Sequence, residues 1–351
     1  MLMKHILTAL FVFVSVLLFA QSEENLSDTQ IQLKKKAHLL FNDGVKLIQQ
    51  EEYTQAHLKF DEALFIMPDF DLPYLERGKI KMKRSEYELA MKDVNVSIEL
   101  NSELAEAYYC KGYMQYLKND FKSAFENLNK AIQKGYVTAE AYYYRGLLHF
   151  NFEDYNNAMI DFTMALDKNP EFAYAYHERG SSKRMLNDNQ GAINDYNLAI
   201  KINPEIVTAY DNMGLCKINI GDFNGAIEDY TKAIQLKPDF YFAYNNRGNA
   251  YFLMANYEAA LNDFTKVIEI KKDYIIAYNN LGITNVKMQN YITAVKNLTK
   301  AIELNPKYAE AYLNRGYAQE FLGKFNDACA DWKMAKELGL NDAEKYMNEC
   351  E

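Results

Sequence analysis

Apolar and polar positions recur along this chain with a constant period, equal to the distance from Gly44 to Gly78. Each period holds two apolar stretches of helical spacing with a short polar turn between them, which predicts two helices of about 14 residues. The helices and turns fill the period and leave no room for strands. One glycine row marks the period without insertion or deletion: Gly44, Gly78, Gly112, Gly146, Gly180, Gly214, Gly248, Gly282 and Gly316.

Other rows keep a fixed distance from this glycine row. An alanine follows each glycine at the same sequence distance that separates Gly44 from Ala56. An apolar or aromatic residue follows each glycine at the distance that separates Gly44 from Phe60. A Gly on one helix and an Ala on the next allow two backbones to approach closely, so we expect larger residues to interlock around them as a core. The apolar and aromatic row is Phe60, Val94, Leu128, Phe162, Tyr196, Tyr230, Phe264, Leu298 and Trp332.

Short polar residues and prolines mark the helix ends. Pro68, Pro170, Pro204, Pro238 and Pro306 close repeats, because proline cannot continue the helix before it. Short polar side chains precede the second helix, where they are predicted to cap it: Asp120, Asp154, Asp188, Asp222, Asn256 and Asn290.

Together these residues resemble the tetratricopeptide repeat family. Its pattern, with a period of about 34 residues, is matched by Tyr142, Gly146, Ala158, Phe162 and Pro170, although several repeats carry Arg before the glycine where Leu is commoner. The resemblance implies an all-α fold, a right-handed α-solenoid whose first helices line a concave surface. The nine predicted repeats are 37–70, 71–104, 105–138, 139–172, 173–206, 207–240, 241–274, 275–308 and 309–342.

Segments outside the repeats have other roles. Residues 21–36 form an N-terminal polar segment, and 343–351 are predicted to be a short capping helix. Lys4, the apolar run 6–19 and Ala20 have the layout of a secretory signal peptide, so we predict cleavage after Ala20 and no membrane span in the mature chain. An uncleaved anchor is the alternative, although 14 residues are short for a span of about 20. We therefore expect an exported protein, periplasmic or secreted, from a Gram-negative bacterium.

The four cysteines do not form a dense disulfide framework. Cys110 and Cys216 fall on helices several repeats apart and are interpreted as buried small residues. Cys329 and Cys350 lie on neighbouring C-terminal segments and can pair, but spacing alone does not decide it.

Charge and motifs exclude several functional classes. The net charge is −9 without a basic tract, which disfavours nucleic acid as a partner. The sequence has no HExxH, metal-ligand spacing, phosphate-binding loop or nucleophile elbow, so we expect no enzyme activity, cofactor or metal. A recurring Asp before the second-helix aromatic is interpreted as a structural partner of the Arg row: Asp93, Asp161, Asp195, Asp229, Asp263 and Asp331.

An asparagine row is the main candidate binding feature. Asn212, Asn246, Asn280 and Asn314 each stand two positions before a glycine, and Asn245 and Asn279 precede two of them. A side-chain amide both donates and accepts, so a row of amides can bind the backbone of an extended peptide. The arrangement is similar to the asparagine ladder of O-linked N-acetylglucosamine transferases. The alternative is that the amides cap neighbouring groups or face water.

Aromatic residues add a second candidate patch. Tyr109, Tyr113, Tyr143 and Tyr144 lie on the first helices of repeats three and four, beyond the core row. They can line a binding surface or belong to the core. The carboxylate clamp known in chaperone-binding members of the family is disfavoured, because Glu106, Glu140 and Glu310 stand where a Lys is needed.

The sequence therefore predicts a non-enzymatic scaffold that binds a protein or extended peptide in its concave groove, outside the cytoplasm. Two alternatives remain. The chain can be a structural adaptor of an envelope assembly that uses convex or end surfaces, or an accessory subunit of an exported enzyme complex.

Overall fold

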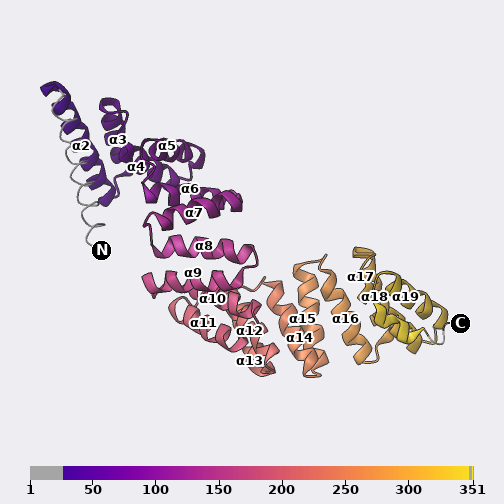
Figure 1. Ribbon diagram of the computed structural model, residues 1–351. Coiled ribbons are helices and arrows are strands. Elements are labelled where there is room, and N and C mark those ends of the chain that lie inside the picture. Colours follow the sequence, from indigo (N-terminus) through magenta and orange to yellow (C-terminus); the bar gives the residue numbers. More distant parts are fainter. Residues whose placement is uncertain (1–26, 348–349, 351) are drawn as a thin grey trace, which may run out of the picture. The chain divides into compact units, whose positions relative to one another are not determined.

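The computed structural model describes residues 27–347 and residue 350. Within them the chain forms an α-solenoid of tandem helix pairs, and no strand occurs (Figure 1). The predicted signal peptide, 1–20, lies outside the described residues. The chain divides into two compact units, residues 1–148 and 149–351.

The N-terminal unit holds the first repeats. Over residues 28–133, each first helix packs against the second helix that follows it, and each second helix packs against the next first helix within that range. The helices are α2 (Asp28–Gln49), α3 (Tyr53–Ile66), α4 (Asp71–Lys83), α5 (Tyr87–Leu100), α6 (Ala105–Leu117), α7 (Phe121–Gln133) and most of α8 (Ala139–Asn151).

The C-terminal unit continues the same order. It contains α9 (Tyr155–Lys168), α10 (Ala173–Met185), α11 (Asn189–Ile202), α12 (Val207–Asn219), α13 (Phe223–Leu236), α14 (Tyr241–Leu253), α15 (Tyr257–Ile270), α16 (Ile275–Lys287), α17 (Tyr291–Leu304), α18 (Ala309–Phe321), α19 (Phe325–Glu337) and the 3₁₀ helix η1 (Asn341–Tyr346).

The glycine row lies where paired helices meet, as predicted. A Cβ on Gly248 would lie 2.7 Å from Phe264 Cε1, and one on Gly44 would lie 2.5 Å from Phe60 Cε1. Phe264 and Phe60 are fully buried, and so is Ala260 in the alanine row. The absent side chain therefore makes room for the ring of the second helix.

The turn inside each repeat has a feature that the sequence analysis did not anticipate. One residue adopts a left-handed conformation, with φ near +60° at most positions. It is glycine in two repeats, at Gly221 and Gly323, where no Cβ resists this conformation. In the other turns a residue with a side chain adopts this strained, left-handed conformation: Glu51, Ser85, Asn119, Glu153, Asn187, Ala255 and Gln289.

Most predicted helix caps are present. The side chain of Asp120 accepts a hydrogen bond from Ser123 N, and Asp154, Asp188, Asp222 and Asn256 make the equivalent bond. Asn290 stands at the same position but makes no side-chain cap, so that prediction is wrong. At the N-terminus, residues 28–36 extend α2, which Ser27 and Gln30 close with a reciprocal capping box.

The C-terminal segment differs from the capping helix predicted over 343–351. The structure has the shorter 3₁₀ helix η1 there, and residues 348, 349 and 351 lie outside the described part. A disulfide joins Cys329 of α19 to Cys350, with Cα atoms 5.5 Å apart. The Tyr346 ring packs 5.6 Å from that of Trp332, so η1 covers the end of the last repeat.

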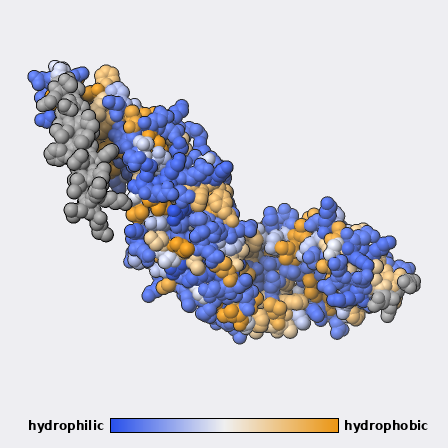
Figure 2. All heavy atoms as spheres, in the orientation of Figure 1, coloured by the Kyte–Doolittle hydropathy of each residue, from blue (hydrophilic) through white to orange (hydrophobic). Residues whose placement is uncertain are grey.

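The face drawn in Figure 2 is mostly hydrophilic, with hydrophobic residues scattered among the hydrophilic ones. None of the chain's described helices combines the length and apolar character needed to span a bilayer.

The close contact at the glycine row gives a stability test. Replacing Gly248 with Ala is expected to lower the free energy of unfolding by about 1–2 kcal/mol, because overpacking against the buried Phe264 ring exceeds the gain of about 1 kcal/mol in helix propensity. Gly78→Ala is the control: the closest atom to its Cβ would be a Val94 methyl at 3.0 Å, and the next, Ala90 O at 3.4 Å, is at ordinary contact distance, so the two effects should nearly cancel. Urea unfolding followed by circular dichroism measures both, and equal losses would contradict the overpacking account.

Candidate functional site

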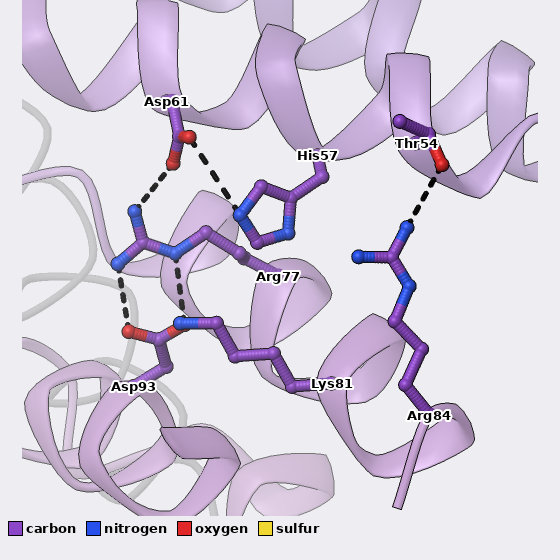
Figure 3. Close-up of polar contacts among 7 residues, drawn as sticks. All are labelled: Thr54, His57, Asp61, Arg77, Lys81, Arg84 and Asp93. Atoms are coloured by element: carbon purple, nitrogen blue, oxygen red, sulfur yellow. Dashed lines mark hydrogen bonds and ion pairs between the residues drawn. The ribbon is translucent and has the colours of Figure 1, made fainter. Parts of the chain in front are cut away.

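A row of arginines on the first helices holds these helices against the second helices. Arg77 donates from Nε and Nη2 to the two carboxylate oxygens of Asp93, at 2.8 and 2.7 Å, and from Nη1 to Asp61 at 2.6 Å (Figure 3). Asp93 lies on the second helix of the same repeat, whereas Asp61 belongs to the preceding one. The guanidinium therefore bridges two repeats.

The same bridge recurs in the C-terminal unit. Arg179, Arg247 and Arg315 bind Asp195, Asp263 and Asp331 through two nitrogens, and their Nη1 atoms donate to Thr163, Thr231 and Thr299 of the preceding repeat. These carboxylates are buried, so removing the arginine from a pair would leave an uncompensated buried charge and would destabilise the fold more than breaking an exposed ion pair. The predicted structural role of the Asp row is confirmed at these positions. The sequence analysis missed the bond to the preceding repeat.

Electrostatics around Arg77 agree with this structural role. Burial alone would raise the pKa of Asp93, but hydrogen bonds from Arg77 and Lys81 outweigh it and lower the pKa. Burial lowers the pKa of the nearby His57, against the opposing effect of Asp61 (Figure 3). His57 is therefore mainly neutral at pH 7, and its Nε2 lies 3.6 Å from Asp61 Oδ2.

The asparagine row links consecutive repeats. Asn246 Nδ2 donates to Asp211 Oδ1 at 3.0 Å, and Asn314 Nδ2 donates to Asn279 Oδ1 at 3.0 Å. Asn280 Nδ2 donates to Asn245 Oδ1 at 3.2 Å, and Asn212 Nδ2 lies 3.4 Å from His177 Nε2. Each bond joins residues 35 apart. We call the half-buried row Asn212, Asn246, Asn280 and Asn314 the ladder.

This geometry separates the six predicted asparagines into two groups. Asn245 and Asn279 are buried acceptors beneath the ladder rather than exposed residues beside it. Each ladder amide uses an Nδ2 hydrogen for the contact with the preceding repeat, and no described residue donates a hydrogen bond to its Oδ1. Asn280 Nδ2 makes a second hydrogen bond, in which it donates to Asn249 Oδ1 at 3.2 Å. The interpretation that the amides satisfy neighbouring groups is thus correct for their nitrogens.

The predicted tyrosines are brought together in the N-terminal unit. Tyr113 packs 4.8 Å from Tyr144, which packs 5.4 Å from Tyr143, and Tyr109 stacks at 6.2 Å on Tyr113. All four are half-buried, so each ring is shared between the core and the surface. Tyr136 and Tyr116 join this cluster, with ring centroids 4.9 Å from Tyr109 and 5.3 Å from Tyr144. Burial raises the pKa of Tyr109 and Tyr144 well above the ordinary range, so their hydroxyls stay protonated.

Other reactive groups are sparse. Cys110 and Cys216 are buried thiols whose pKa values burial raises to about 12 and about 11, which makes them poor nucleophiles at neutral pH. In the part of the chain that the structure describes, no three His, Cys, Asp or Glu side chains are grouped to hold a metal ion.

Family comparison agrees with the helix pairs and the glycine row. Models of the tetratricopeptide repeat match residues 116–171, 173–206 and 241–274, and a further repeat model matches 219–254 and 286–323. Together they cover more than half of the chain. The chain belongs to the tetratricopeptide repeat family.

Solved structures support the fold of this tetratricopeptide repeat protein. A tetratricopeptide repeat protein from Parabacteroides merdae is 22% identical with a TM-score of 0.55, covering 69% of this chain and 97% of its own. The C-terminal part of a repeat-containing protein from Cytophaga hutchinsonii is 21% identical with a TM-score of 0.56, covering 68% and 98%. Comparison with curated protein sequences gives no match.

One residue beneath the ladder differs in charge from its neighbours. Asp211 stands where the next two repeats carry Asn245 and Asn279, and it is equally buried. Burial raises the pKa of Asp211 to about 6, although the hydrogen bond from Asn246 and the charge of Arg184 oppose this shift. The native chain therefore keeps this proton to a higher pH than the unfolded chain does. Ionisation of Asp211 costs stability as the pH rises from about 4 to about 6, and the loss persists above pH 6.

This linkage predicts a pH-dependent effect of Asp211→Asn. The variant is expected to be more stable than the wild type at pH 7.5, by on the order of 2 kcal/mol, and equally stable at pH 4. Asn245→Asp is the matched control, because it introduces the same buried carboxylate one repeat later and should lose stability at pH 7.5. Urea unfolding at both pH values measures this, and a gain independent of pH would contradict the assignment.

Proposed function

We propose that this tetratricopeptide repeat protein is an exported, non-enzymatic scaffold that binds an extended protein segment along the first-helix face, in a concave groove. One observation supports the proposal: consecutive ladder amides donate from their nitrogens to the preceding repeat, and no described residue donates to their carbonyl oxygens. A row of acceptors spaced by the repeat suits the N–H groups of an extended backbone. The half-buried tyrosine cluster offers contact area in the other unit.

Two sets of substitutions separate a loss of binding through the ladder oxygens from a loss of structure. The triple variant Asn246→Ala, Asn280→Ala, Asn314→Ala removes both the oxygens and the inter-repeat bonds. The double variant Asn245→Ala, Asn279→Ala removes two of those bonds from the buried side and leaves the ladder oxygens in place. At about 1 kcal/mol per hydrogen bond, the triple variant should weaken binding about 100-fold, and the double variant much less.

A random 12-residue peptide display library selected on residues 21–351 supplies the probes, and fluorescence anisotropy measures their affinity. Circular dichroism confirms that both variants are folded at the assay temperature. Equal loss in the two variants would show that the asparagines act only on structure. The failure of any peptide to be enriched would contradict the proposed function.

A second candidate function rests on an exposed ring. Phe65 on α3 is 90% exposed. The same position is polar or charged in every other repeat: Glu99, Gln133, Asp167, Lys201, Gln235, Glu269, Glu303 and Glu337. A large apolar side chain at this position favours contact between a second-helix surface and another protein, as the adaptor alternative requires.

Export is the other part of the proposal. The layout of residues 1–20 and the bond between Cys329 and Cys350 both suit an oxidising compartment. When the full chain is expressed in a Gram-negative host, we expect mass spectrometry of the periplasmic fraction to give a chain that begins at Gln21 and holds one disulfide. A chain without residues 2–20 is the control and should keep reduced thiols in the cytoplasm. Retention of residues 1–20 would contradict cleavage and favour the anchor.

A further inference from the structure

Two pockets lie beside consecutive residues of the ladder in the C-terminal unit. The first lies between α14 and α16, has a volume of about 110 Å³, and is lined by Asn249, Phe252, Phe264, Asn280, Ile283 and Thr284. The second lies between α16 and α18, has a volume of about 240 Å³, and is lined by Ile283, Val286, Lys287, Leu313, Asn314, Tyr317 and Tyr346.

The two pockets occupy equivalent positions in consecutive repeats. Asn280 and Asn314 occupy the same position in consecutive repeats, and so do Phe252 and Val286. Ile283 contributes to both pockets. A backbone held by the oxygens of Asn280 and Asn314 would therefore pass both pocket mouths in succession.

The first pocket suits an aliphatic side chain. Phe252, Phe264 and Ile283 supply apolar walls, and the hydrogen-bonded amides of Asn249 and Asn280 stand beside them. Its volume is below that of the roughly 150 Å³ apolar cavity that accommodates benzene. A side chain the size of Val or Leu fits this space and buries its apolar surface there.

The second pocket differs in charge. Lys287 is exposed at its edge and forms no ion pair with any described residue. The aromatic side is built by Tyr317 and by Tyr346 of η1, whose rings pack 5.8 Å apart. An ammonium group without a carboxylate partner favours an acidic side chain in the ligand.

The spacing of the pockets sets the spacing of the two ligand residues. Neighbouring first helices α14, α16 and α18 are in contact, and packed helices lie about 8–10 Å apart. A polyproline II peptide rises about 3.1 Å per residue with three residues per turn, so residues i and i+3 share a face about 9 Å apart. These two distances agree.

We propose that the ladder face of repeats seven to nine recognises an extended peptide with an aliphatic residue and, three residues away, an Asp or Glu. The aliphatic side chain enters the pocket of Phe252 and Ile283, and the carboxylate pairs with Lys287. This inference rests on the proposed function and specifies its ligand.

The test compares the peptides that different chains enrich from the random 12-residue display library. The wild type should enrich sequences with the aliphatic and acidic residues three apart, in one chain direction or the other. Lys287→Glu should replace the acidic preference with Lys or Arg and weaken binding of a wild-type-selected peptide about fivefold, the value of an ion pair near 1 kcal/mol. Lys296→Glu is the matched control, because it makes the same charge change at an exposed position on α17 of the same repeat.

The outcomes distinguish the pocket assignment from the scaffold function on which it rests. Enriched peptides that depend on the ladder but lack the spacing, or that respond equally to Lys287→Glu and Lys296→Glu, would overturn the pocket assignment and leave the scaffold function intact. No enrichment by any chain would overturn both. A change of preference confined to Lys287→Glu supports the assignment, since the substituted side chain is exposed and leaves the core unchanged.

Discussion

The close approach of two helices at each glycine is the constraint on which the rest of the structure depends. Where the Gly248 backbone faces the Phe264 ring, a methyl group would already overlap it. The pairing of first and second helix is therefore fixed to within one residue. Because all repeats have the same length, every other row keeps its place relative to this contact. The ladder and the arginine row are consequences of that fixed register.

Polar bonds then join one repeat to the next. The Arg row and the ladder both contact the preceding repeat, through residues 16 and 35 positions earlier. Repeats one, three, six and eight lack this arginine and carry Asp43, Lys111, Met213 and Leu281 in its place. Of these four repeats, only repeat six keeps the aspartate, Asp229. Lys217 lies 2.8 Å from that carboxylate, yet burial still raises the pKa of Asp229. With Asp211 also buried in this repeat, repeat six holds two carboxylates whose pKa burial raises.

The sequence predicts the recurring contacts within one helix pair. It misses many of the contacts between one pair and the next. Gly44 and Phe60, or Asp120 and its helix, are determined by local spacing and could be identified from periodicity. The bond from Asn314 to Asn279 depends on which faces of successive first helices meet, and no short-range pattern encodes that geometry. The left-handed Ala255 was missed because its residue type gives no signal. Asn290 was assigned a cap because residue type alone does not fix the side-chain rotamer.

The same distinction connects the binding role proposed for the ladder with its contribution to stability. Its nitrogens are committed to holding repeats together, so the orientation of each carbonyl oxygen is set before a ligand arrives. A preorganised acceptor loses little side-chain entropy on binding, which favours affinity from few contacts. Asn280 illustrates the point, because its two bonds to α14 fix the amide plane at the mouth of the pocket formed by Phe252 and Ile283. The interactions that stack the repeats therefore also orient the carbonyl oxygens that the proposed function assigns to a peptide.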